Sequence, residues 1–147
     1  MRKTIFSVLV LTAITVALAA WRSDNRGFGG IEAVAASHLA TQSSSARSVT
    51  VKVTPQNVAG DAKTWSFAIV LDTHSAELND DLVKSSLLLD SAGGRFTPVA
   101  WDGAPPGGHH REGVLRFKPV SPQPQSIELQ ITRAGEDAPR SFRWQLK

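Results

Sequence analysis

Cysteine is absent from the 147 residues, and so is tyrosine. The lack of cysteine excludes disulfide bonds, thiolate metal sites, thiol catalysis and lipid attachment to an N-terminal cysteine. A folded domain in this chain must therefore be held together by its core alone. Since tyrosine is missing too, Trp65, Trp101 and Trp144 are expected to supply the large aromatic side chains.

Runs of like charge are also lacking. Lysine and arginine number 16 against 13 aspartates and glutamates, and two of the 16, Arg2 and Lys3, lie in the first nineteen residues. The other charges are interspersed, without the basic stripe that neutralises phosphates in nucleic-acid binders. We therefore expect no nucleic-acid partner. A charged fraction of 20% and a hydrophobic fraction of 41% indicate a globular chain, with room for one domain.

The N-terminus has the pattern of a secretory signal. A basic head precedes residues 5–20, which are apolar apart from Ser7, Thr12 and Thr15. Alanines at positions 17 and 19 suit cleavage before Ala20, whereas an uncleaved segment 5–21 is barely long enough to anchor the chain in a membrane. Residues 1–20 are thus expected to be a signal peptide or a membrane anchor. Both interpretations place the rest of the chain outside the cytoplasm, in the periplasm or secreted, with membrane contact only through an uncleaved N-terminal segment.

Residues 21–46 show no sustained period and end in a serine-rich stretch, which predicts a flexible linker. From Arg47 onward, apolar and polar residues alternate with period two, the pattern of half-buried strands. Strands are expected at residues 49–53, 65–71, 87–89, 96–101, 114–120, 127–131 and 142–146. About seven short strands separated by glycine- and proline-rich turns predict an all-β fold, a single immunoglobulin-like antiparallel β-sandwich over residues 47–147. A small barrel is the alternative.

Two further expectations concern the connections. The segment from Glu77 to Val83 is expected to hold one helical turn, capped by Asn79 or Asp80. If the strands alternate in direction, the connections after residues 71, 101 and 132 lie at the same end of the domain. That end would then carry the polar residues Asp72, His74, His109 and His110.

The stretch from Trp101 to Gly113 is the least ordinary part of the chain, because it contains two prolines, two adjacent glycines and two adjacent histidines. Imidazole nitrogen suits zinc, copper and nickel. One hypothesis is therefore a metal site at the shared end, made by His74, His109, His110 and Asp72. Adjacent histidines in a strand point to opposite faces, however, so only one of the pair would point inward in a regular strand.

Two other interpretations of this stretch stay open. The loop can serve only to cover the end of the sandwich, with Trp101 packed on the prolines and Arg111 paired with Asp102 or Asp72. Alternatively it can recognise a protein or small ligand, for which Trp101, Asp102 and Arg111 are the candidate contacts. Catalysis is not expected, because Asp72, His74 and Ser75 are neighbours in sequence and no nucleophile elbow is present.

The run from Trp101 to Phe117 resembles a segment of small exported bacterial proteins that have an immunoglobulin-like domain and no assigned activity. The matching residues are Trp101, Gly103, 105–111, 113–115 and Phe117, with residues 71–75 upstream. The resemblance implies export and the sandwich fold, and it implies no catalytic or ligand residues. We therefore expect an exported, non-enzymatic binding or accessory module with a protein or small-ligand partner. The alternative is a periplasmic transition-metal-binding protein that uses the loop histidines.

Overall fold

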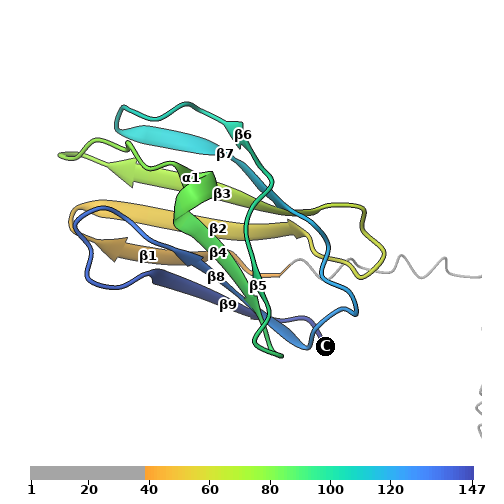
Figure 1. Cartoon of the computed structure of the whole chain (residues 1–147). Coiled ribbons are helices and arrows are strands. Elements are labelled where there is room, and N and C mark those ends of the chain that lie inside the picture. Colours follow the sequence, from red (N-terminus) through yellow and green to blue (C-terminus); the bar gives the residue numbers. More distant parts are fainter. Residues whose placement is uncertain (1–38) are drawn as a thin grey trace, which may run out of the picture. The chain divides into compact units, whose positions relative to one another are not determined.

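The computed structural model describes residues 39–147, which form two antiparallel sheets (Figure 1). The expected signal peptide or anchor and most of the expected linker fall in residues 1–38, outside the described part. Within residues 39–147, no helix is long and apolar enough to cross a membrane.

The connectivity is that of an immunoglobulin-like sandwich. The first sheet has the order β1 (Gln42–Ala46), β2 (Val49–Asn57), β3 (Trp65–Thr73), β7 (His110–Phe117), β6 (Ala100–Gly103), and the second has β5 (Arg95–Phe96), β4 (Ser86–Asp90), β8 (Ser126–Ile131), β9 (Arg140–Gln145). The order β2-β3-β7-β6 opposite β4-β8-β9 corresponds to strands A-B-E-D and C-F-G of immunoglobulin domains. The predicted fold class is thus confirmed, with nine strands instead of about seven.

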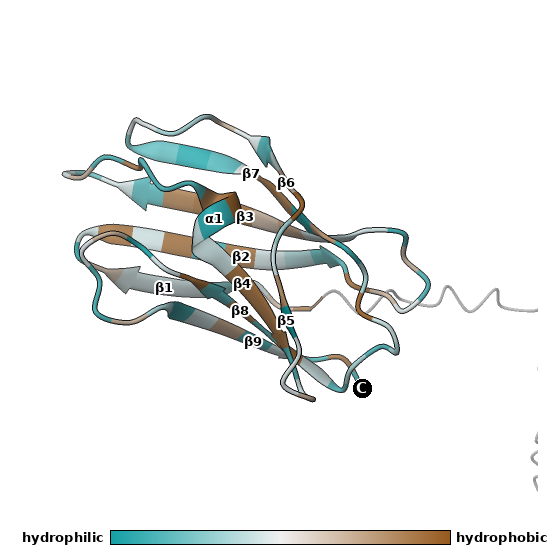
Figure 2. Cartoon of the chain, viewed as in Figure 1, coloured by the Kyte–Doolittle hydropathy of each residue, from teal (hydrophilic) through white to brown (hydrophobic). Residues whose placement is uncertain are grey.

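Period-two alternation builds the core between the sheets. In β3, every second side chain from Trp65 to Thr73 is buried, and Figure 2 shows apolar residues recurring along the strands. The ring centre of Phe67 in the first sheet lies 5.6 Å from that of Phe117, in an edge-to-face arrangement. It lies 5.9 Å from the ring centre of Trp144 in the second sheet. Aromatic packing therefore joins the two sheets in a chain that has no cysteine for a disulfide.

The expected strand at residues 96–101 is divided between the two sheets. β5 pairs with β4 in one sheet, and β6 pairs with β7 in the other. Between them lies Pro98, which is buried and belongs to no strand. Proline has no N–H for a ladder bond, so the chain can change sheets at this point. β5 and β6 together run along the domain in one direction, as the single expected strand would. The strands that follow therefore keep the expected alternation of direction.

The end of the expected linker is a strand. β1 pairs with β2 from Gln42 opposite Val53 to Ala46 opposite Val49. None of its side chains belongs to the apolar core, so the alternation that marks the other strands is missing from its sequence. Polar bonds position β1 instead, including one from the Arg143 amide to the Gln42 side chain (3.0 Å).

The helical turn α1 (Leu82–Ser85) begins later than expected. Its N-cap is Asp81, whose Oδ1 accepts hydrogen bonds from the amides of Val83 (3.2 Å) and Lys84 (3.3 Å). Asn79 and Asp80 were the predicted caps, and both are used elsewhere. The side chain of Asp80 in particular is 7% exposed and accepts hydrogen bonds from an arginine of another loop.

Three loops and one turn meet at one end of the sandwich, as the alternation of strand direction predicts. We call residues 47–48, 74–81, 104–109 and 132–139 the loop end. The 74–81 loop pairs with the 104–109 loop through Leu78, whose amide donates to Gly108 (3.1 Å) and whose carbonyl accepts from Gly107 (2.9 Å). The described chain starts at the opposite end, where Figure 1 also places the C-terminus. The Trp144 indole accordingly donates to the Ala40 carbonyl (2.8 Å).

Candidate functional site

The glycines of the stretch 101–113 have specific structural tasks. Gly107 and Gly108 have φ values of +116° and +71°, which other residues rarely adopt, and they form the turn that pairs with Leu78. Gly103 and Gly113 face each other across β6 and β7. A Cβ added to Gly113 would lie 2.5 Å from the Gly103 Cα and 2.7 Å from the Trp101 ring. The Trp101 ring therefore packs over the two glycines.

Arg111 fastens the 74–81 loop to the sandwich. Its side chain is 1% exposed and donates to the carbonyls of Leu78 (2.9 Å), Asp80 (2.8 Å) and Ala104 (3.3 Å). Its guanidinium carbon lies 5.8 Å from the centre of the Trp101 ring, and burial lowers the pKa of the guanidinium. The expected pairing of Arg111 with Asp102 or Asp72 is wrong, since backbone carbonyls take its hydrogen bonds.

The three candidate ligand contacts all have partners within the chain. Trp101 packs on Gly103 and Gly113, and its indole N–H donates to the Ala104 carbonyl (2.9 Å). Asp102 pairs with Arg116 of β7. With Arg111 buried, this stretch covers the end of the sandwich and holds the neighbouring loop in place.

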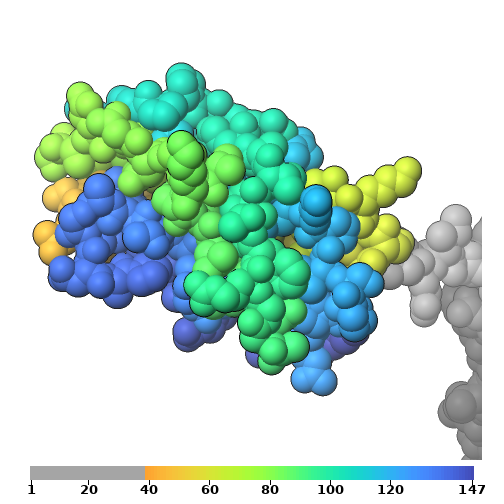
Figure 3. All heavy atoms as spheres, in the orientation of Figure 1, coloured from red at the N-terminus to blue at the C-terminus, as the bar shows by residue number. Residues whose placement is uncertain are grey.

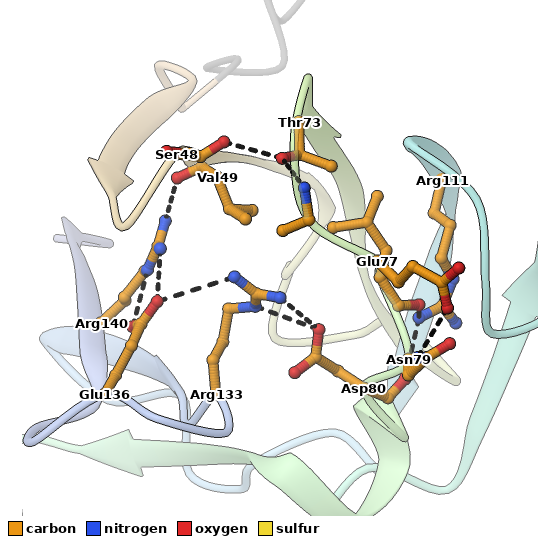
Figure 4. A network of polar contacts seen from close by, with 12 residues as sticks. Ser48, Val49, Thr73, Glu77, Asn79, Asp80, Arg111, Arg133, Glu136 and Arg140 are labelled. Carbon is orange, nitrogen blue, oxygen red and sulfur yellow. Dashed lines mark hydrogen bonds and ion pairs between the residues drawn. The ribbon is translucent and has the colours of Figure 1, made fainter.

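A chain of buried ion pairs continues from Arg111 across the loop end (Figure 4). Arg133 donates to Asp80 Oδ2 through Nε (3.0 Å) and Nη2 (2.8 Å). Its Nη1 lies 3.6 Å from Glu136, which accepts two bonds from Arg140 (2.9 and 2.5 Å). The side chains of these four residues are only 4–8% exposed.

Arg140 extends this chain to the β1–β2 turn. It donates to the carbonyls of Ser44 (2.8 Å), Ala46 (2.9 Å) and Val49 (2.9 Å). The hydrogen bonds from Arg140 also lower the pKa of Glu136 below its ordinary value, which favours its ionised form. The sequence signal for this site is the spacing of Arg133, Glu136 and Arg140 around a glycine turn, and it lies outside the stretch 101–113 that the sequence singles out.

The expected metal quartet does not form one cluster. His110 Nδ1 lies 2.5 Å from Asp72 Oδ1, and its Nε2 lies 3.7 Å from Glu112; the bond to Asp72 raises the pKa of His110. His74 and His109 are exposed. In residues 39–147, no group of three or more histidine, aspartate or glutamate side chains is arranged to hold a metal ion. His110 begins β7 and pairs with Asp72 of β3, whereas His109 lies in the preceding loop.

A hollow of about 310 Å³ lies at the loop end, above the buried ion pairs. Its wall comes from the β1–β2 turn (Arg47), the 74–81 loop (Glu77, Asn79, Asp80) and the 132–139 loop (Arg133, Glu136). In Figure 3 the 74–81 loop (green) lies against the 132–139 loop (blue) at this end. The hollow therefore has a floor of buried charges and a rim of exposed polar residues.

The sequence matches no family model, and comparison with curated proteins and with solved structures also finds no match. The site must therefore be interpreted from its own geometry. That geometry consists of a fixed set of loops, a polar hollow, and an exposed rim that carries both positive and negative side chains.

Proposed function

We propose that this chain is an exported, non-enzymatic binding or accessory module that recognises its partner through the loop end. One observation supports this most strongly. The loops around the hollow are fixed by buried arginines, while the described chain enters the domain at the opposite end. A module attached through its N-terminal segment would thus present the loop end to its surroundings.

Fixed loops favour binding for a physical reason. Loops that are ordered before binding lose little conformational entropy in the complex, so more of the contact energy appears as affinity. The rim supplies the contacts, with Arg47, Glu77, Asn79 and Asp137 all exposed. A protein or a small polar ligand can be recognised by such a surface.

The extracytoplasmic location is part of the same proposal. It rests on the basic head and apolar stretch of residues 1–20 and on the absence of cysteine, which leaves the fold indifferent to redox conditions. Fractionation of producing cells tests this part, and recovery of the chain in the cytoplasm would contradict it.

Site-specific photo-crosslinking in the producing cells tests the role of the loop end. A photoreactive residue replaces His109 or Asp137 at the loop end, or Lys63 or Ser121 at the opposite end; all four positions are exposed. We expect a crosslinked protein partner from the first two positions only. Crosslinks from the opposite end alone, or equal crosslinks from both ends, would contradict the proposal.

A further inference from the structure

We propose that β1 is an exchangeable strand, and that two copies of this chain form a dimer in which the β1 of each copy pairs with the β2 of the other. β1 is the edge strand of its sheet and is joined to β2 by a turn of only two residues. The inference concerns assembly, so it goes beyond the proposed function of the loop end and does not depend on it. Two observations carry it, namely the strain in the turn and the kind of contacts that hold β1.

The turn between β1 and β2 has a conformation that does not suit its residues. Arg47 and Ser48 have φ values of +46° and +62°, and they are the only non-glycine residues with positive φ in the part of the chain that the structure describes. Two-residue hairpin turns with positive φ at both positions favour Asn-Gly or Asp-Gly, because most side chains are strained there. Opening the turn into an extended strand therefore relieves strain at two residues at once. Short hinge loops under strain favour the exchange of the element that they hold.

The contacts that hold β1 can be made equally well by a second copy. β1 contributes no side chain to the apolar core. Arg140 donates to two of its carbonyls, those of Ser44 (2.8 Å) and Ala46 (2.9 Å), and Ser45 Oγ lies 2.8 Å from Thr50 Oγ1. Each of these contacts joins β1 to another strand, and none requires the two strands to belong to the same chain. Exchange therefore preserves them all.

The register of the hairpin is already that of a symmetric dimer. Gln42 lies opposite Val53, and the pairing continues without a shift to Ala46 opposite Val49. Once the turn is open, residues 42–57 form one continuous strand, and two such strands pair antiparallel about a two-fold axis at positions 47–48. Every pair of the hairpin is then kept between the two copies. The rest of the first sheet continues from β2 through β3, so the two domains lie on opposite sides of the shared ribbon.

The balance between the closed and the exchanged form depends on protein concentration. In dilute solution the turn keeps β1 close to its own β2, which favours the closed monomer. Exchange needs a second copy, so the dimer gains with concentration. Removing the strain from the turn should shift the balance back toward the monomer. Both dependences can be measured.

The absence of cysteine from the chain allows the pairing to be identified by disulfide formation. Two full-length variants, Ser45→Cys and Thr50→Cys, are produced together with different affinity tags and purified under reducing conditions in a nonionic detergent. They are then oxidised at protein concentrations from about 1 μM to about 1 mM. Each variant has one cysteine, so no disulfide can form within a molecule. We expect a disulfide that joins the two variants, in an amount that rises with concentration, because position 45 of one copy lies opposite position 50 of the other.

Three controls make the result specific. Each variant oxidised alone should stay monomeric, since neither position lies opposite itself. A mixture of Val70→Cys and Glu112→Cys, which are partners between β3 and β7, should also stay monomeric because these strands are not exchanged. The double change Arg47→Asn and Ser48→Gly gives the turn residues that suit it and should lower the amount of the mixed disulfide by at least about tenfold.

Three outcomes would each overturn the inference. These are the absence of the mixed disulfide at every concentration, an equal amount of dimer from the β3–β7 mixture, and no effect of the double change in the turn. Any of them would leave the proposed function standing, because that function rests on the loops of a single domain.

Discussion

Glu136 allows the energetic role of the buried ion pairs to be measured. Its side chain is 7% exposed and accepts two hydrogen bonds from Arg140, itself 4% exposed, while Arg133 Nη1 lies 3.6 Å away. Glu136→Gln keeps the side-chain size but leaves two buried guanidinium groups with one anion fewer. Removing one member of a buried pair costs about 3–5 kcal/mol. Because glutamine can still accept a hydrogen bond, we expect the free energy of unfolding to fall by about 3 kcal/mol.

The adjacent residue provides a matched control. Asp137 pairs with Arg47 at 3.5 Å, but the two side chains are 98% and 62% exposed. Asp137→Asn makes the same chemical change one position away, and we expect no measurable loss of stability. Urea unfolding followed by tryptophan fluorescence at pH 7 compares the two variants. Equal losses, or a loss below about 1 kcal/mol for Glu136→Gln, would refute the assignment of a buried network.

The pH dependence of the same pair gives an independent check. The hydrogen bonds from Arg140 place the folded-state pKa of Glu136 below its ordinary value of 4.5. A carboxylate with a lowered pKa contributes stability above its unfolded-state pKa and loses that contribution as the pH falls through its folded-state pKa. The difference in stability between the wild-type chain and Glu136→Gln should therefore be constant above about pH 5 and shrink in stronger acid.

Two further predictions concern β7. Gly113→Ala should lower the free energy of unfolding by about 2 kcal/mol, because overpacking costs about 1–3 kcal/mol and the new Cβ would lie 2.5 Å from the Gly103 Cα. Gly60→Ala is the control, because the atoms nearest to its new Cβ belong to the flexible Gln123 side chain, at 3.3 Å. Equal losses of unfolding free energy in the two variants would contradict the close packing at Gly113. His110 should titrate above its ordinary pKa of 6.5 in NMR spectra and return toward it in Asp72→Asn. An unshifted His110 in the wild-type chain would contradict the contact with Asp72.

Much of the fold was predictable because it follows from side-chain alternation alone. Strands such as β3, where every second residue is buried, carry the period in their sequence. β1 carries no such signal, since it packs no apolar side chain and depends on bonds to β9. The division of one expected strand at Pro98 is a property of the two sheets together, and local sequence patterns do not encode it.

The position of the candidate site was predictable, and its chemistry was not. Alternating strand direction was enough to bring the loops together at one end. The partners of the charged residues there depend on side chains distant in sequence, such as Arg133 with Asp80 and Arg140 with the β1–β2 turn. The sequence predicts the adjacent histidines as metal ligands, but His110 faces Asp72 on the outer side of its sheet. The buried arginines, which carry the site, looked in the sequence like ordinary surface charges.

The central claim is that Arg111 and its neighbours hold the 74–81 loop rigidly in place, so that the loop end is ready to bind. Amide hydrogen exchange in the wild-type chain and in Arg111→Met measures this most directly. We expect the amides of Leu78 and Gly107, which form the loop-to-loop bonds, to exchange slowly in the wild-type chain. In the variant they should exchange at least about a hundredfold faster, while Ile127 in β8 changes little. Fast exchange of Leu78 in the wild-type chain, or no change in the variant, would contradict the claim.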